Sequence, residues 1–149
     1  MKLAEALQER ADLNRRIADL RSRLADNALV QEGERPAEDP AELMAELDRC
    51  VAALEERIAR INLINCRTWV GGKTLTELLA RRDCLTVQIG AYRDLLSTAS
   101  QTARRARGTE IKVLSTVNVA QLQKQVDAMS HELRTLDNTI QQANWTTEM

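Results

Sequence analysis

The sequence has no phenylalanine, a single histidine and only 2% aromatic residues among its 149 positions. A core without large rings must be built from leucine, isoleucine, valine and alanine, which favours helices packed on helices. One histidine cannot supply the paired Glu-x-x-His motifs of a di-metal carboxylate bundle. The three cysteines show no metal-ligand spacing. We therefore expect no metal, no cofactor and no catalytic constellation, and predict that the protein is not an enzyme.

Long apolar runs and an excess of one charge are also missing. No stretch approaches the roughly 18 apolar residues of a membrane-spanning helix, and the first residues enter an amphipathic pattern without resembling a signal peptide. The net charge of −1 argues against obligatory binding to nucleic acid. Three unpaired-looking cysteines fit a reducing compartment. Together these features predict a soluble cytoplasmic protein.

Four segments carry apolar residues at alternating spacings of three and four, the pattern of a helix seam. The expected helices cover residues 2–26, 40–65, 75–101 and 119–144. Asp39 and Asn118 are placed to cap the second and fourth helices, and Pro40 suits a first helical position. The pattern predicts an all-α fold of four long helices, arranged as two antiparallel coiled-coil-like hairpins in a four-helix bundle.

The second half of the sequence repeats the first. Residues 3–24 recur 72 positions later and residues 39–65 recur 79 positions later, with polar as well as apolar identities such as Arg10/Arg82 and Asp48/Asp127. Such an echo indicates internal duplication. We expect one domain over 1–149, with repeat one at 1–66 and repeat two at 73–146. The second linker is longer by seven residues, the difference between the two offsets.

Arg10 and Arg82 occupy seam positions where an apolar side chain is expected. A buried guanidinium needs a carboxylate partner or an escape to solvent. Folding each hairpin about its linker brings Arg10 near Glu55 and Glu56, and Arg82 near Asp137. We predict structural ion pairs that fix the register of each hairpin; the alternatives are an exposed arginine and an anion-binding site.

Four shorter features also have structural interpretations. The stretch Gly71-Gly72-Lys73-Thr74 resembles the tail of a phosphate-binding loop, but it lacks the upstream glycine and favours a simple turn. The basic run at 104–107 is expected to be a solvated linker, with contact to nucleic acid, an acidic partner or anionic lipid as the alternatives. The β-branched residues 110–117 could pair with 27–31, which would form a small β-ribbon from the two linkers. Trp69 and Trp145 are expected to pack at one end of the bundle or to anchor an interface.

Several linker and tail segments carry a family resemblance: Val30-Gln31-Glu32-Gly33-Glu34, Pro36-Ala37-Glu38-Asp39-Pro40, Glu110-Ile111-Lys112, Ser115-Thr116-Val117 and Ala143-Asn144-Trp145-Thr146-Thr147-Glu148. Over these residues the chain resembles the septicolysin-like family of small bacterial proteins. The family name implies a cytolysin, but the resemblance brings no catalytic residues with it. Because binding functions concentrate in loops, the candidate interaction residues are those in the two linkers: Gln31, Glu32, Glu34, Glu110, Lys112 and Ser115.

Apolar residues that fall outside the main seams, such as Leu63, Ile64, Val87 and Leu95, suggest a second stripe and self-association. We therefore predict a non-enzymatic helical-bundle protein for self-assembly or protein interaction, present as a homo-oligomer. A membrane-active protein, which the resemblance implies, is the first alternative. A nucleic-acid-binding accessory protein using residues 104–107 is the second.

Overall fold

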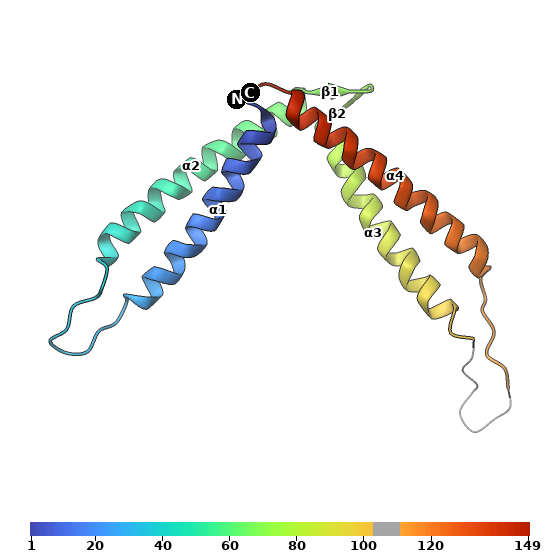
Figure 1. Cartoon of the computed structure of the whole chain (residues 1–149), viewed down its shortest axis with the longest axis horizontal. Helices are drawn as coiled ribbons and strands as arrows, with labels where there is room; N and C mark the ends of the chain where they lie inside the picture. The colour runs from blue at the N-terminus through green and yellow to red at the C-terminus, as the bar shows by residue number, and fades with distance from the viewer. Residues whose placement is uncertain (103–110) are drawn as a thin grey trace. The chain divides into compact units, whose positions relative to one another are not determined.

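The structure is a computed structural model, and it describes residues 1–102 and 111–149 of the chain (Figure 1). These residues form four helices: α1 (Leu3–Asp26), α2 (Pro40–Arg67), α3 (Leu75–Ala99) and α4 (Val119–Thr146). Every boundary lies within two residues of the expected one, which is the ordinary uncertainty of helix ends. The predicted all-α class is confirmed. The basic run at 104–107 and Glu110 lie outside the described residues.

The chain divides into two compact units, of which the first is made of two separate segments. The first contains Met1–Thr74 together with Ala143–Met149, and the second contains Leu75–Gln142. The division falls close to the expected boundary between the repeats, except that the C-terminal residues belong with the first repeat. The single domain over 1–149 stays a prediction.

In the first unit, α1 and α2 run antiparallel and pack along the predicted seam (Figure 1). Its buried apolar residues include Leu3, Ala6, Leu20, Leu43, Cys50 and Ile61. Among these, Leu20, Leu43 and Cys50 form a cluster, and four partly buried residues pack against it: Leu13, Ile17, Leu24 and Leu47. Cys50 is a free thiol in the core and acts there as a small apolar side chain.

The two predicted caps are both present. The Asp39 carboxylate accepts a hydrogen bond from the backbone N–H of Ala41 at 2.9 Å, and Pro40 is the first residue of α2. The Asn118 side chain accepts one from the backbone N–H of Gln121 at 3.0 Å. Each side chain satisfies a helix N–H that has no partner within the helix. The equivalent starts of α2 and α4 agree with the 79-residue offset.

A two-stranded ribbon exists, but between α2 and α3 rather than between the linkers. Strand β1 (Trp69–Val70) pairs antiparallel with β2 (Lys73–Thr74). The turn between them is Gly71-Gly72, with φ values of 58° and 84°, which is the two-residue geometry that matches the twist of a hairpin. Residues 27–39 of the first linker carry no strand, so the expected pairing of 27–31 with the second linker is wrong. The glycines therefore form a turn, as expected from the incomplete phosphate-loop pattern.

The two ends of the chain are hydrogen-bonded to each other within the first unit. The Leu3 N–H donates to the Thr147 carbonyl at 2.9 Å, and the Met149 N–H donates to the Met1 carbonyl at 2.9 Å. Lys2 and Glu148 form an antiparallel bridge between these bonds. The Lys2 ammonium and the Met1 amino group both hydrogen-bond the Glu148 carboxylate, which holds the pKa of Glu148 below its ordinary value.

The second unit repeats the helical hairpin with α3 and α4. Its buried apolar residues are Leu75, Leu85, Ile89, Leu122, Val126 and Ile140. Two polar contacts link the helices: Arg81 pairs with Glu132 at 2.8 Å, and Arg93 donates to the Ser130 hydroxyl at 3.3 Å. In the described part of the chain, no helix is both long enough and apolar enough to cross a membrane.

Candidate functional site

The seam arginines do not form the predicted ion pairs. Arg10 makes no ion pair with Glu55, Glu56 or any other described residue, and Arg82 pairs with its neighbour Asp83 at 3.1 Å rather than with Asp137. Both arginine side chains are half-buried rather than enclosed. Because each guanidinium can reach water at the edge of the seam, neither needs a counter-charge from the opposite helix. The prediction that Arg10 and Arg82 form ion pairs across each hairpin was therefore wrong.

The ion pair that joins α1 to α2 near Arg10 uses the preceding residue, Glu9. The Arg57 guanidinium contacts the Glu9 carboxylate at 2.5 Å and the Met1 sulfur at 3.5 Å. Arg57 is the better-covered partner, with 23% of its side chain exposed. In the antiparallel packing of α1 on α2, Glu9 rather than Arg10 therefore makes the ion pair between the helices. The half-buried Arg10 side chain reaches solvent instead.

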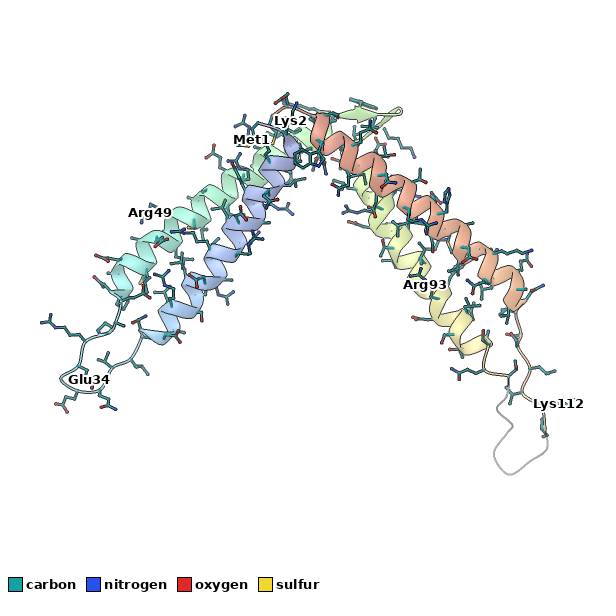
Figure 2. All side chains as sticks on the ribbon, in the orientation of Figure 1. Met1, Lys2, Glu34, Arg49, Arg93 and Lys112 are labelled. Atoms are coloured by element: carbon teal, nitrogen blue, oxygen red, sulfur yellow. The ribbon has the colours of Figure 1, made fainter. Side chains whose placement is uncertain are left out.

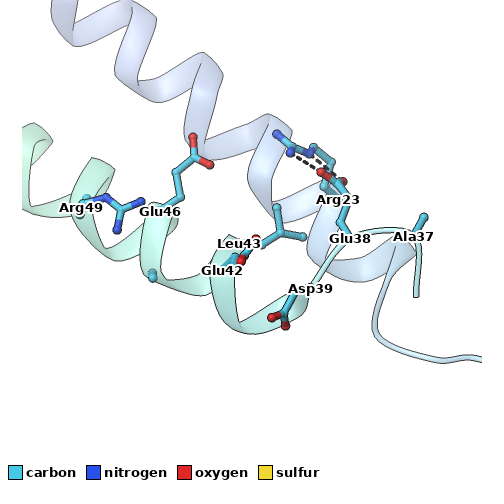
Figure 3. Close-up of a pocket in the computed structure, with 9 residues that line it drawn as sticks. Arg23, Ala37, Glu38, Asp39, Glu42, Leu43, Glu46 and Arg49 are labelled. Carbon is cyan, nitrogen blue, oxygen red and sulfur yellow. Dashed lines mark hydrogen bonds and ion pairs between the residues drawn. The ribbon is translucent and has the colours of Figure 1, made fainter. Parts of the chain in front are cut away.

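A clamp formed by Arg23, Asn27 and Glu38 closes the first linker; Figure 3 shows its Arg23–Glu38 contact. The Arg23 Nε–H donates to the Glu38 carboxylate at 2.9 Å, and a second guanidinium nitrogen also contacts it. The Asn27 side chain donates to the Arg23 carbonyl at 2.8 Å and accepts the backbone N–H of Glu38 at 2.9 Å. Hydrogen bonding to Arg23 holds the pKa of Glu38 below its ordinary value, and the pKa of Arg23 is raised in turn. The clamp fixes where the linker leaves α1 and enters α2.

Sequence reasoning missed this clamp, although the repeat carries a signal for it. Seventy-two residues after Arg23 and Asn27 stand Leu95 and Ala99, and seventy-nine after Glu38 stands Val117. All three polar members of the clamp are thus apolar in the second repeat. Positions that change character together are candidates for mutual contact.

An open groove of about 540 Å³ lies beside the clamp, on the α2 side of the first linker (Figure 3). Its charged lining residues are Arg23, Glu38, Asp39, Glu42, Glu46 and Arg49. Glu46 already pairs with Arg16, with the Arg16 Nε at 2.8 Å, whereas Glu42 and Arg49 make no ion pair in the first unit. Among the described residues, no cluster of three acidic, histidine or cysteine side chains is placed to hold a metal ion. The groove offers ionic contacts to a partner and no arrangement of nucleophile and base.

The candidate linker residues fall into two groups. Gln31, Glu32 and Glu34 are exposed on the loop between α1 and α2, where the Glu34 N–H donates to the Gln31 carbonyl at 3.0 Å (Figure 2). Lys112 and Ser115 lie in the loop that precedes α4. Lys112 is exposed, while the Ser115 hydroxyl donates to the Val117 carbonyl at 2.9 Å and forms a local turn. None of these residues lines the charged groove beside the clamp.

Exposed apolar side chains recur along α2 at a spacing of seven. Met44, Val51 and Ile58 are 55%, 46% and 37% exposed, although all three lie within a regular helix. In the second unit, Val87 and Leu95 are exposed on α3 at 74% and 45%. Leu63 is exposed and Ile64 is half-buried. The sequence predicted a second apolar stripe from four residues: Leu63, Ile64, Val87 and Leu95. The regular stripe of Met44, Val51 and Ile58 on α2 was not predicted.

The two tryptophans are exposed rather than packed. Trp69 in β1 is 67% exposed and Trp145 at the end of α4 is 61% exposed, so the expectation that they pack at the end of the bundle was wrong. Trp145 lines an open, mainly apolar recess of about 500 Å³ with Met1, Ala4 and Gln8. Exposed tryptophans beside apolar recesses are features of interaction surfaces.

Comparisons with known proteins cover almost the whole chain. The family model described as a family of unknown function (DUF6847) matches residues 10–149. A solved structure of a functionally unknown conserved protein from Corynebacterium diphtheriae is 38% identical, with a TM-score of 0.93, and the match covers 100% of this chain and 98% of that one. The comparison with curated proteins finds no match.

These comparisons overturn the septicolysin-like resemblance. The matching family and the similar structure both carry descriptions of unknown function, and neither points to septicolysin or to cytolysis. The linker and tail segments that suggested the resemblance lie largely within the matched residues 10–149. They are therefore part of the DUF6847 match, and the cytolysin implied by the earlier resemblance has no support.

Proposed function

We propose that this chain, which belongs to the DUF6847 family of unknown function, is a non-enzymatic interaction protein that associates with itself through exposed apolar helix faces. The single observation that carries the proposal is the stripe of Met44, Val51 and Ile58 on α2. A stripe of large apolar side chains at a seven-residue spacing is the pattern of a helix that packs against another helix. The α1–α2 seam does not cover these three residues.

The energetic gain from covering such a stripe is considerable. Complete burial of one valine, isoleucine or methionine side chain stabilises an association by about 1.5–3 kcal/mol. In a symmetric dimer each copy contributes its own stripe, so the gain is counted twice. Because the three side chains are 37–55% exposed in the single chain, about half of this gain remains to be made. The total then falls at the low end of the roughly 4–15 kcal/mol that two proteins lose in translational and rotational freedom on binding. The stripe is therefore large enough to contribute most of a weak to moderate self-association.

The polar side chains support interaction rather than catalysis. Three of the six charged residues of the groove are engaged in ion pairs: Arg23 and Glu38 with each other, and Glu46 with Arg16. The single histidine, His131, is exposed on α4. Ion pairs of this kind fix helix register and shape a surface, and they supply no group poised to transfer a proton.

The direct test is the mass of the protein in solution, measured by light scattering over a range of concentrations. A chain of 16.8 kDa that associates with itself should give a mass rising to twice this value or more with concentration. Added salt should not abolish the association, because burial of apolar surface drives it. A mass of one chain at every concentration up to the millimolar range would rule out self-association.

A further inference from the structure

We propose that one face of the first hairpin, formed by the alanines of α1 and the Met44–Val51–Ile58 stripe of α2, docks a second copy of the chain, with α2 of each copy lying on α1 of the other. The inference rests on the proposed self-association and assigns it a surface and a symmetry. We call this surface the alanine face; it consists of Ala4, Ala11, Ala18, Ala25, Met44, Val51 and Ile58.

The opposite face of the same hairpin is charged. Three ion pairs join its two halves there: Arg57 with Glu9, Arg16 with Glu46, and Arg23 with Glu38. Glu9, Arg16 and Arg23 are seven residues apart, so they form one stripe along α1. A hairpin made of two helices has two broad faces, and these pairs define one of them.

The alanines of α1 lie away from that charged face. Ala11, Ala18 and Ala25 each follow an ion-pairing residue, Glu9, Arg16 or Arg23, by two positions. Two residues turn an α-helix by about 200°, which is close to the opposite side. Ala4 continues the same seven-residue spacing. Except for the half-buried Ala4, these alanines are exposed, and a row of small side chains lets another helix approach closely.

The apolar stripe of α2 lies on the same face. Met44 precedes the ion-pairing Glu46 by two residues, and its seven-residue spacing continues through Val51 to Ile58. The alanine face therefore has a row of small side chains on α1 and a row of large side chains on α2. The large row of one copy fits the small row of another if the two copies are related by a two-fold axis parallel to the helices.

The charges beside the two rows favour packing α2 of one copy on α1 of the other over packing α2 on α2. Asp48 and Glu55 flank the large row on α2, and Arg15 and Arg21 flank the small row on α1. Asp48, Glu55 and Arg21 make no ion pair within the first unit, and Arg15 pairs with Asp12 on its own helix. At the level that the Arg16–Glu46 pair sets, placing α2 on α1 brings Asp48 of one copy beside Arg15 of the other. Placing α2 on α2 antiparallel would bring Asp48 to Glu55, which is a like-charge contact.

The size of the alanine face is adequate for a stable dimer. α1 has 24 residues and α2 has 28, so the hairpin is roughly 36 Å long at a rise of 1.5 Å per residue, and two packed helices are roughly 20 Å wide. The face measures about 700 Å², close to the roughly 800 Å² per partner of a standard protein interface. The second hairpin lacks this face, because Gln123, Ser130 and Asp137 stand 79 residues after Met44, Val51 and Ile58.

The test compares two exposed valines on different helices in the full-length protein. Val51→Glu places a carboxylate at the centre of the alanine face, and Val87→Glu makes the same change on α3. We expect Val51→Glu to raise the dissociation constant measured by analytical ultracentrifugation at least about 100-fold, because a carboxylate without a partner is buried in each copy. Val87→Glu should change it less than about threefold. Circular dichroism establishes that both variants keep their helices.

The outcomes separate this inference from the proposed function. If Val51→Glu associates as the wild type does, or if Val87→Glu weakens association equally, the alanine face is not the interface, while self-association itself stands. If the wild type is a monomer at all concentrations, both proposals fail.

Reversing the charges beside the two rows gives a second, independent readout. Asp48→Arg should weaken association, and adding Arg15→Glu to the same chain should restore it; a failure to restore it would overturn the placement of α2 on α1.

Discussion

The Asn27 side chain joins the end of α1 to the backbone of Glu38, eleven residues further along the chain. Its carbonyl oxygen accepts the Glu38 N–H at 2.9 Å while its amide donates to the Arg23 carbonyl at 2.8 Å. Asn27 is only 9% exposed. One asparagine thus fixes the start and the finish of the first linker.

Replacing Asn27 with alanine should therefore destabilise the protein. The substitution leaves the part-buried Glu38 N–H without its partner, which costs about 1–3 kcal/mol, while the Arg23 carbonyl keeps its bond from the Asn27 backbone N–H at 3.1 Å. Urea denaturation followed by circular dichroism measures this loss. Asn14→Ala is the matched control, because Asn14 makes a similar bond to the Arg10 carbonyl at 3.0 Å on an exposed helix surface. Its effect should stay within about 0.5 kcal/mol; equal losses for the two variants would contradict the assigned role of Asn27.

Arg10→Leu should not destabilise the protein. Arg10 occupies an apolar seam position and makes no ion pair among the described residues, so leucine adds apolar contact without stranding a carboxylate. A gain of up to about 1 kcal/mol is expected from the additional buried area. Arg57→Leu is the comparison, because it removes the ion pair with Glu9. A lower melting temperature for Arg10→Leu than for Arg57→Leu would show that Arg10 has a partner after all.

Acid should weaken the linker clamp. The pKa of Glu38 is held below its ordinary value of 4.5 by hydrogen bonding to Arg23, so its carboxylate contributes stability above pH 4.5. That contribution is lost as the pH falls below 4.5 and through the lowered pKa. In Glu38→Gln the loss of stability on acidification should be smaller than in the wild type. Glu34→Gln, on the same loop and without an ion pair in the first unit, should retain the wild-type profile when melting is measured from pH 6 to pH 2.5. Parallel profiles for Glu38→Gln and the wild type would refute the prediction.

The two equivalent helix caps should make equivalent contributions. Asp39→Ala and Asn118→Ala each remove a hydrogen bond to the first turn of a helix, which costs about 1 kcal/mol in each case. Chemical denaturation of both single variants and of the double variant measures the two terms. Because the caps belong to different units, their effects should add. A negligible loss for either variant would mean that water replaces that cap without cost.

The helices were predictable because their signals are local and redundant. The seam leucines, Pro40 and the capping residues Asp39 and Asn118 all indicate the same boundaries, and the structure agrees. The ribbon was misplaced for a related reason. Gly71 and Gly72 supply the positive φ angles that a two-residue hairpin needs, which is a more specific signal for a ribbon than β propensity alone.

The polar contacts were harder to predict, because they depend on the exact level at which two helices meet. Arg10 was expected to pair with Glu55 or Glu56, whereas the observed pair joins the residues next to them, Glu9 and Arg57. Periodicity marks which face of a helix is buried, but it leaves such a shift undetermined. The clamp of Arg23, Asn27 and Glu38 has no sequence motif of its own. Only the comparison of equivalent positions in the two repeats sets it apart.

The hydrogen bonds between Met1–Leu3 and Thr147–Met149 bring the two ends of the chain into adjacent positions. A few glycine and serine residues would span the gap and make the polypeptide circular without disturbing either helix. New ends could then be opened in the exposed loop around Glu32, between α1 and α2, where Gly33 marks a turn. In such a circular permutant α1 would be joined directly to α4, and the order in which the four helices leave the ribosome would change while their packing partners stay the same.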